Sequence, residues 1–256
     1  MSIRIRLAGL SVALGVACAA FAAGPDNKSP PLVDEIISKH VSARGGLEPL
    51  RAIKNITRTG RLVLPENSID LKVSEVRARP NRIRVEVTLQ GLTAVQAWDG
   101  KDAWQVQPFE GRKDPARMSA DEAKDLALSA DIDTPLVDYK AKGHTVEYLG
   151  LDDLDGTPAY MVRVHLKSGD EMTYWIDPDT SMILRSLEKQ LLRGAEQLTE
   201  TDYGDYEQAG GVYFPTVEEQ GPKGSDASQK QKFVYEKILV NTPVDEHQFA
   251  LPPSAR

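Results

Sequence analysis

Residues 77–109 read RARPNRIRVEVTLQGLTAVQAWDGKDAWQVQPF, and this stretch decides the fold. After Pro80, apolar and polar side chains alternate over residues 82–89, which is the period of a strand with one apolar face. Gly91 ends that strand, residues 92–98 are extended again, and Asp99-Gly100 is a hairpin signal before residues 103–107. Three strands with such short connections predict an antiparallel meander whose apolar face must be covered.

The same strand pattern continues on both sides of this stretch. Turn sequences such as Asp155-Gly156 and Gly210-Gly211 separate the expected strands. An open sheet of about twelve strands must curl or divide into two. The further strands are expected at residues 56–64, 69–77, 145–151, 159–166, 172–176, 183–189, 198–206, 212–217 and 232–240.

Two segments have helical periodicity instead. Residues 32–44 carry apolar side chains at spacings of three and four and end at Gly45-Gly46, and a short turn is expected at residues 47–52. Residues 119–130 begin with a Ser-x-x-Glu capping pattern and carry a modest Ala and Leu stripe. Residues 131–143 are expected to form a loop or a broken helix.

The first 22 residues have the composition of a secretory signal peptide. Arg4 and Arg6 form a basic start, residues 7–17 are apolar and short, and Ala20-Phe21-Ala22 supplies a small-residue cleavage pattern. The alternative is lipid attachment at Cys18, although the residue three before it is a glycine instead of the aliphatic residue that such signals carry.

Cleavage near residue 22 would leave the mature chain without a cysteine, and therefore without a disulfide or a thiol nucleophile. Residues 23–31 are polar and rich in proline, and are expected to be a disordered leader. Residues 32–256 show no internal linker or repeat, so one domain is the simplest organisation.

Charge and motifs argue against several classes of function. The formal net charge of −7 disfavours nucleic acid and anionic lipid surfaces as partners. No serine-hydrolase elbow, zinc-protease motif, phosphate-binding loop or dinucleotide fingerprint occurs in the sequence. We therefore expect no catalytic residue, no metal site and no cofactor, and a hydrolase is the less favoured alternative. The four histidines are scattered singly, at His40, His144, His165 and His247.

Several short motifs occur in a particular order along the chain. An Arg-Pro-Asn triplet precedes the alternating strand, and a hairpin, a tryptophan and a Pro-Phe pair follow it. The motifs are Arg79-Pro80-Asn81, Asp99-Gly100, Trp104, Pro108-Phe109, Val244-Asp245, Phe249 and Pro252-Pro253. This order resembles the LolA/LolB-like family of periplasmic outer-membrane lipoprotein carriers. Residues 110–117 and 121–138 depart from the family's central segment.

The meander and the resemblance together predict an α+β, mainly β fold: one antiparallel meander curled into an incomplete, half-open β-barrel with helical lid segments. The resemblance implies a periplasmic, monomeric carrier that shields the acyl chains of a lipid or acylated lipoprotein in a hydrophobic groove. It also implies an inner-membrane donor and an outer-membrane acceptor. An envelope lipid or lipoprotein sensor is the alternative function, and a fully packed barrel without a groove is the alternative structure.

The candidate groove residues come from the central strands and from the second helical segment. Arg79 matches the arginine that, in the family, bonds to the lid and releases it when an acyl ligand enters. A guanidinium has five fixed donors and can meet several carbonyls at once. The alternative is that Arg79 belongs to a solvated face of arginines. The other candidates are Ile83, Val85, Val87, Trp98, Trp104 and Leu126.

Overall fold

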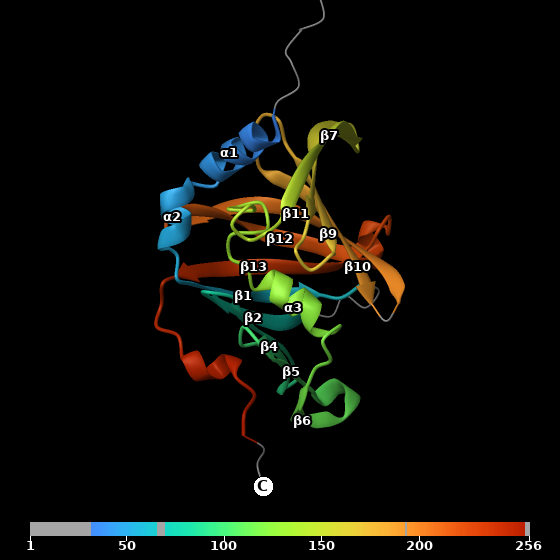
Figure 1. Ribbon diagram of the computed structural model, residues 1–256. Helices are drawn as coiled ribbons and strands as arrows, with labels where there is room; N and C mark the ends of the chain where they lie inside the picture. Colours follow the sequence, from blue (N-terminus) through green and yellow to red (C-terminus); the bar gives the residue numbers. More distant parts are fainter. Residues whose placement is uncertain (1–31, 66–69, 193, 254–256) are drawn as a thin grey trace, which may run out of the picture. The chain divides into compact units, whose positions relative to one another are not determined.

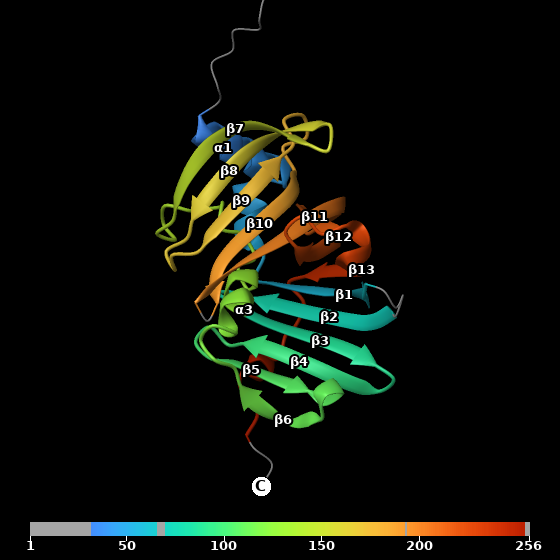
Figure 2. The same ribbon diagram turned by 90° about the vertical axis from the view of Figure 1, so that its right-hand side faces the viewer.

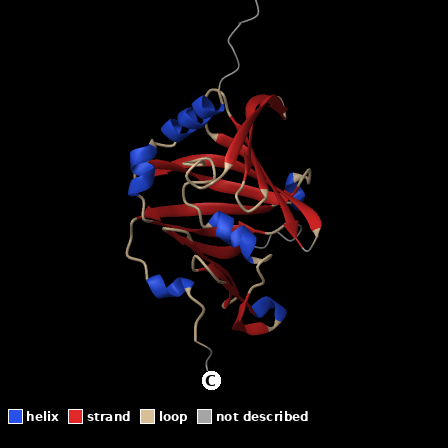
Figure 3. Cartoon of the chain, in the orientation of Figure 1, coloured by secondary structure: helices blue, strands red, loops and turns tan. Residues whose placement is uncertain are grey.

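Strands form most of the described chain, as the alternating patterns predict (Figure 3). The computed structural model describes residues 32–65, 70–192 and 194–253. The expected signal peptide with Cys18 and the expected leader up to residue 31 lie outside the described residues. None of the helices within the described ranges is long and apolar enough to cross a membrane.

The strands form one antiparallel sheet that does not close (Figure 2). Their order is β6-β5-β4-β3-β2-β1-β13-β12-β11-β10-β9-β8-β7, so β6 and β7 are the two edges of the sheet. The predicted incomplete barrel is therefore confirmed. The strands are β1 (Asn55–Val63), β2 (Asp70–Ala78), β3 (Arg82–Leu89), β4 (Leu92–Trp98), β5 (Ala103–Gln107), β6 (Arg112–Arg117), β7 (Thr145–Leu154), β8 (Thr157–His165), β9 (Glu171–Ile176), β10 (Ile183–Leu192), β11 (Ala195–Ala209), β12 (Val212–Pro222) and β13 (Gln231–Val240).

Strand β6 was not expected from the sequence. All six of its residues are exposed, and its composition, with two arginines, a lysine, an aspartate and a proline, shows no apolar alternation. It forms because it continues the ladder from β5, where Gln105 pairs with Ala116. An edge strand without a buried face has no period for sequence reasoning to detect.

The pairing register places alternate side chains of neighbouring strands on one face. Ile83 in β3 is opposite Trp98 in β4 and Arg77 in β2. Val85 is opposite Glu75 in the same way. We call this side the inner face, since it is the one that the helices and the connection between β6 and β7 cover.

The helices are short and lie on the rim and inner face of the sheet (Figure 1). Ile36 and Ile37 of α1 pack into a cluster with Val162 and Tyr174 of β8 and β9, as the periodicity of residues 32–44 predicts. The helices are α1 (Val33–Ala43), α2 (Leu47–Ala52) and α3 (Ala123–Ser129), with single 3₁₀ turns η1 (Pro108–Glu110), η2 (Ala227–Gln229) and η3 (Glu246–Phe249).

Residues 118–144, which we call the crossing segment, join the two edge strands by running over the inner face. Its helix α3 packs Leu126 against Ile83 of β3. Farther along, Ile132 joins a cluster with Phe214 of β12. Leu136 then packs against α1 and the β8–β9 wall. The crossing segment therefore touches both halves of the sheet in turn.

The C-terminal tail, residues 245–253, covers part of the opposite, outer face. Trp104 donates from Nε1 to the carbonyl oxygen of Phe249 over 2.8 Å. The guanidinium of Arg82 lies 5.1 Å from the centre of the Phe249 ring. Phe249 is fully buried as a result. The C-terminal motif around Phe249 thus covers the outer face of β3 and β5.

Gly45 allows α1 to end against β12. Its φ is +120°, and a Cβ there would overlap the carbonyl oxygen of Gly211. The neighbouring backbone pair is formed by the amide of Tyr213, which donates to the Arg44 carbonyl over 2.8 Å. A side chain at Gly45 would disturb both the turn and this contact.

We expect Gly45→Ala to destabilise the protein by about 2 kcal/mol or more, because both the positive φ and the overlap penalise a Cβ. Thermal unfolding should then show a Tm several degrees below that of the unmodified protein. Gly204→Ala is the matched control, since a Cβ there meets only the Val217 side chain at 3.9 Å. Equal Tm values for the two variants would contradict the prediction.

Candidate functional site

The centre of the inner face differs from the hydrophobic groove that the sequence suggested. Arg58 in β1 pairs with Glu75 in β2 at 2.9 Å and with Glu218 in β12 at 2.5 Å. Arg77 joins them through its Nε, 2.7 Å from Glu75. The side chains of Arg58 and Glu75 are only 5% and 6% exposed. The hydrophobic groove that the resemblance implied is therefore interrupted at this position by a buried ion network.

Within this network, the attraction between opposite charges offsets the cost of burying them. Burial alone would raise the pKa of Glu75, but the charges of Arg58 and Arg77 and their hydrogen bonds outweigh it and lower the pKa to about 2. The Arg58 guanidinium also lies 3.8 Å from the centre of the Tyr235 ring. These contacts hold side chains of β1, β2, β12 and β13 in one fixed polar floor.

A cavity of about 180 Å³ lies between this floor and the crossing segment. Its roof includes Leu128 and Ile132, and its walls include Met172, Ile183 and Phe214. A wider pocket of about 810 Å³ adjoins the cavity and shares Ser129, Glu188 and Gln220 with it. The inner face thus holds space that is part apolar and part polar.

The structure brings together some of the residues that the sequence singled out. Ile83, Val85 and Leu126 all line the wider pocket, beneath and beside α3. Trp98 lies on the same face and packs next to Ile83, with its Nε1 buried and without a partner among the described residues. Val87 instead packs against the cluster of β1, β2 and β13 and does not line the pocket.

Trp104 does not belong to this group. It pairs with Ala97 in β4, one residue away from Trp98, so its side chain points to the outer face. There it is 2% exposed and packs with Val95 and the tail residue Leu251. The expectation that both tryptophans line one groove is wrong because adjacent register positions alternate between faces.

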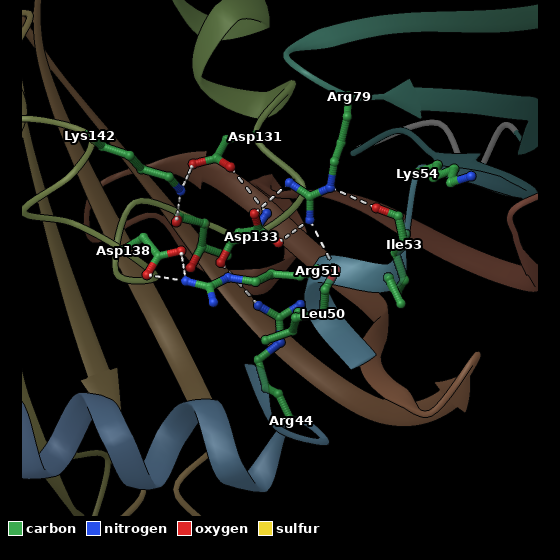
Figure 4. A network of polar contacts seen from close by, with 12 residues as sticks. Arg44, Leu50, Arg51, Ile53, Lys54, Arg79, Asp131, Asp133, Asp138 and Lys142 are labelled. Carbon is green, nitrogen blue, oxygen red and sulfur yellow. Dashed lines mark hydrogen bonds and ion pairs between the residues drawn. The ribbon is translucent and has the colours of Figure 1, made fainter. Parts of the chain in front are cut away.

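Arg79 connects α2 to the crossing segment (Figure 4). Its Nε donates to the Ile53 carbonyl over 2.7 Å, and its Nη2 donates to the Leu50 carbonyl over 3.0 Å. Both Nη atoms also bond to the two carboxylate oxygens of Asp133, each over 2.6 Å. One guanidinium therefore ties carbonyls at the end of a helix to the middle of the crossing segment. The hydrogen bonds and charge of Asp133 outweigh burial and raise the pKa of Arg79.

Further polar contacts hold the same region of the crossing segment (Figure 4). Lys142 pairs with Asp131 at 2.5 Å and donates to the Thr134 carbonyl over 2.7 Å. Arg51 of α2 forms a more exposed ion pair with Asp138 at 3.0 Å. Sequence reasoning missed Asp133, because it stands in an acidic stretch in which no local spacing marks one carboxylate as a partner for Arg79.

Glu188 of β10 has a largely buried carboxyl group that lies near another acidic side chain. Burial, and next the charge of Asp125 on α3, raise the pKa of Glu188 to about 7, and Asp170 adds to the effect. Burial likewise raises the pKa of Asp125. Gln190 donates a short hydrogen bond to Glu188. At high pH, two negative charges therefore face each other between the sheet wall and the helix of the crossing segment.

Comparisons with known proteins agree on the fold. No protein-family model matches the chain, and no curated protein matches its sequence. A LolA superfamily protein from Nitrosomonas europaea matches with a TM-score of 0.57 and 11% identity, over 86% of this chain and 98% of that one. A candidate outer membrane lipoprotein-sorting protein domain from Vibrio parahaemolyticus matches with a TM-score of 0.56 and 12% identity, over 84% of this chain and 94% of that one.

A DUF1329 family protein from Desulfovibrio piger also matches, with a TM-score of 0.50 and 11% identity, over 85% of this chain and 97% of that one. At these identities the likeness establishes the fold. The chain has a LolA-like fold, and the resemblance inferred from its motifs is confirmed at that level.

Glu188→Gln should remove a pH-dependent loss of stability. The pKa of Glu188 in the folded protein lies above its unfolded value, so the folded state binds the proton more tightly and stability falls as pH rises from about 4.5 to 7. We expect the variant and the unmodified protein to differ little near pH 4.5. At pH 8 the variant should have the higher free energy of unfolding, measured by urea denaturation.

Glu236→Gln, which changes an exposed carboxyl group on β13, is the control for this comparison. Its stability should follow that of the unmodified protein at both pH values. A Glu188→Gln variant that gains the same stability at pH 4.5 as at pH 8 would show that the effect does not come from the charge of Glu188.

Proposed function

We propose that this chain is a non-enzymatic, periplasmic binding protein that shields the acyl chains of a lipid or acylated lipoprotein on its inner face and carries it toward the outer membrane. One observation carries the proposal: the connection between the two edge strands covers partly apolar space on the inner face, and Arg79 ties it to α2. The LolA-like fold and the composition of residues 1–22 support it.

The contacts of the crossing segment suggest how it opens. Its two ends are held by the edge strands β6 and β7, while its middle is tied to α2 by Arg79 and Asp133. Breaking the Arg79 contacts would remove the ion pair and hydrogen bonds through which Asp133 ties the middle to α2, while both ends stay attached. We call these contacts the Arg79 latch, and an acyl chain would then take the place of Leu126 and Ile132 on the inner face.

The free energy of the Arg79 latch contacts and the free energy gained by burying an acyl chain are of comparable size. Hydrogen bonds to a charged group contribute roughly 1.5 to 3 kcal/mol each. The latch is partly solvated, since the Arg79 side chain is 30% exposed, so water replaces part of what opening removes. Burying an acyl chain yields roughly 0.8 kcal/mol for each methylene. A chain of ordinary length is therefore able to offset the loss of the latch, whereas a short chain is not.

Binding of a palmitoylated peptide, compared with the same peptide without the acyl chain, tests the proposal directly. We expect the full-length mature protein to bind only the acylated form, as measured by fluorescence anisotropy of a label on the peptide. Mass spectrometry of the protein purified from its own compartment should also detect a bound lipid. If neither peptide binds and no lipid is found, the carrier function is refuted.

The latch itself is tested by Arg79→Ala. Because the closed state would lose its tie to Asp133, the binding-competent state should be more populated and the apparent affinity for the acylated peptide should rise about tenfold. Amide exchange should also become faster across residues 128–137. Arg51→Ala, which removes the exposed pair with Asp138, should change both readings little. Unchanged affinity and exchange in Arg79→Ala would show that Arg79 only stabilises the fold.

A further inference from the structure

The end of α1 presents two buried polar side chains to the cavity beneath the crossing segment. His40 and Arg44 are one helical turn apart, both line the cavity, and they are 0% and 5% exposed. Neither is part of the ion network on the sheet floor. The proposed acyl-binding function gives neither of them a role.

His40 offers an acceptor that nothing in the described chain uses. Its Nδ1 lies 2.8 Å from the carbonyl oxygen of Ser181, so Nδ1 carries the proton and donates it. Its Nε2 is buried and has no hydrogen-bond partner among the described residues. Burial, followed by the charge of Arg44, lowers the pKa of His40 to about 4. The ring is therefore neutral near pH 7.

Arg44 is a buried cation that makes no ion pair within the described residues. It donates to the carbonyls of Asp133 and Tyr213 over 3.3 and 3.4 Å, which are long bonds. Its guanidinium also lies 5.7 Å from the centre of the Phe214 ring (Figure 4 shows the side chain). Leaving a guanidinium in such a place without a counter-charge is costly.

The other charged side chains that line the cavity, apart from Glu188, are already paired with opposite charges. Arg58 and Arg77 share Glu75 and Glu218. On the roof, Asp131 is paired with Lys142. The remaining carboxyl group, Glu188, has a pKa of about 7 and is therefore mostly protonated at pH 6. Burial lowers the pKa of Arg44 and outweighs the charges of Asp133 and Asp131, which also act on it. Near pH 6, Arg44 therefore contributes one positive charge that no ion pair among the described side chains neutralises.

The rest of the cavity is suited to an apolar chain with a small polar end. Thr134, on the crossing segment, places a second buried and unpartnered polar atom, its hydroxyl oxygen, in the cavity wall. The apolar part of the lining includes Ile132, Met172, Ile183 and Phe214, and the sheet floor with its ion network lines the opposite side. Such a cavity matches an amphiphile that carries one compact acidic group.

We propose that the cavity binds the free carboxylate of an unesterified fatty acid, with Arg44 donating to the carboxylate oxygens and Thr134 donating its hydroxyl hydrogen beside them. This inference rests on the proposed acyl-binding function and narrows its ligand class. One uncompensated positive charge suits a carboxylate better than a phosphate monoester, which carries −1.5 to −2 charges at pH 7. An ester or an alcohol would leave Arg44 without a counter-charge, so we expect either to bind more weakly than the carboxylate.

The test compares ligands with the same twelve-carbon chain and different ends: dodecanoate, dodecan-1-ol and dodecyl phosphate, titrated into the full-length mature protein at pH 6 by calorimetry, where Glu188 is mostly protonated. We expect dodecanoate to bind about 10- to 100-fold more tightly than the alcohol, because it gains charge-assisted hydrogen bonds. Dodecyl phosphate should bind more weakly than dodecanoate.

Variants then assign the preference to the cavity. Arg44→Gln should abolish the advantage of dodecanoate while leaving the affinity for dodecan-1-ol within about twofold, and Thr134→Val should reduce the advantage several-fold. Lys39→Gln, an exposed change on the same helix, is the control. The comparison of ligands on the unmodified protein still decides the matter if Arg44→Gln fails to fold.

The outcomes separate this inference from the proposed function. Equal binding of dodecanoate and dodecan-1-ol would overturn the carboxylate site and leave acyl binding intact. Tighter binding of dodecyl phosphate would overturn the choice of head group. Binding of the palmitoylated peptide with no binding of dodecanoate would overturn the inference alone. If none of the acyl ligands binds, both proposals are refuted.

Discussion

The structure depends on one topological constraint: β6 and β7 follow each other in the chain but lie at opposite edges of the sheet. The connection between them must therefore cross the whole sheet, and it does so on the inner face. Its side chains fill part of the space that an incomplete barrel leaves open. The same segment connects the two open edges of the sheet and forms the roof of the cavity, and only its ends belong to the ladder.

The arginine side chains beneath and beside the crossing segment differ in how fully they are paired with opposite charges. Burying arginine and glutamate side chains costs several kcal/mol per ion unless they are paired and hydrogen-bonded, and Arg58 and Glu75 satisfy this condition fully. Arg79 satisfies it only when the crossing segment is in place, since Asp133 lies on that segment. Arg44 does not satisfy it within the described chain. These differences distinguish the buried ion network of the floor, the proposed Arg79 latch and the proposed site for an anionic ligand.

Sequence reasoning succeeded where the signal was local. The three strands between residues 82 and 107 and their tight connections follow from alternation and from the Asp99-Gly100 turn. It failed where the outcome depended on a neighbour in space. Strand β6 has no apolar face and forms only by extending β5. Trp104 faces outward because it is one register position from the inward-facing positions, and the tail supplies the Phe249 carbonyl that its indole bonds.

The sequence by itself determined most of the strand and helix segments, the order of the hairpins and the likeness to a LolA-like fold, because periodicity and turn chemistry act over a few residues. Only the tertiary structure decided which charges meet. Arg58 is separated from Glu218 by 160 positions, and Arg79 from Asp133 by 54, so no local pattern marks these pairs. The inner face is polar at its centre because the sheet pairs β1 with β13, which brings two strands from the start of the meander next to two from its end.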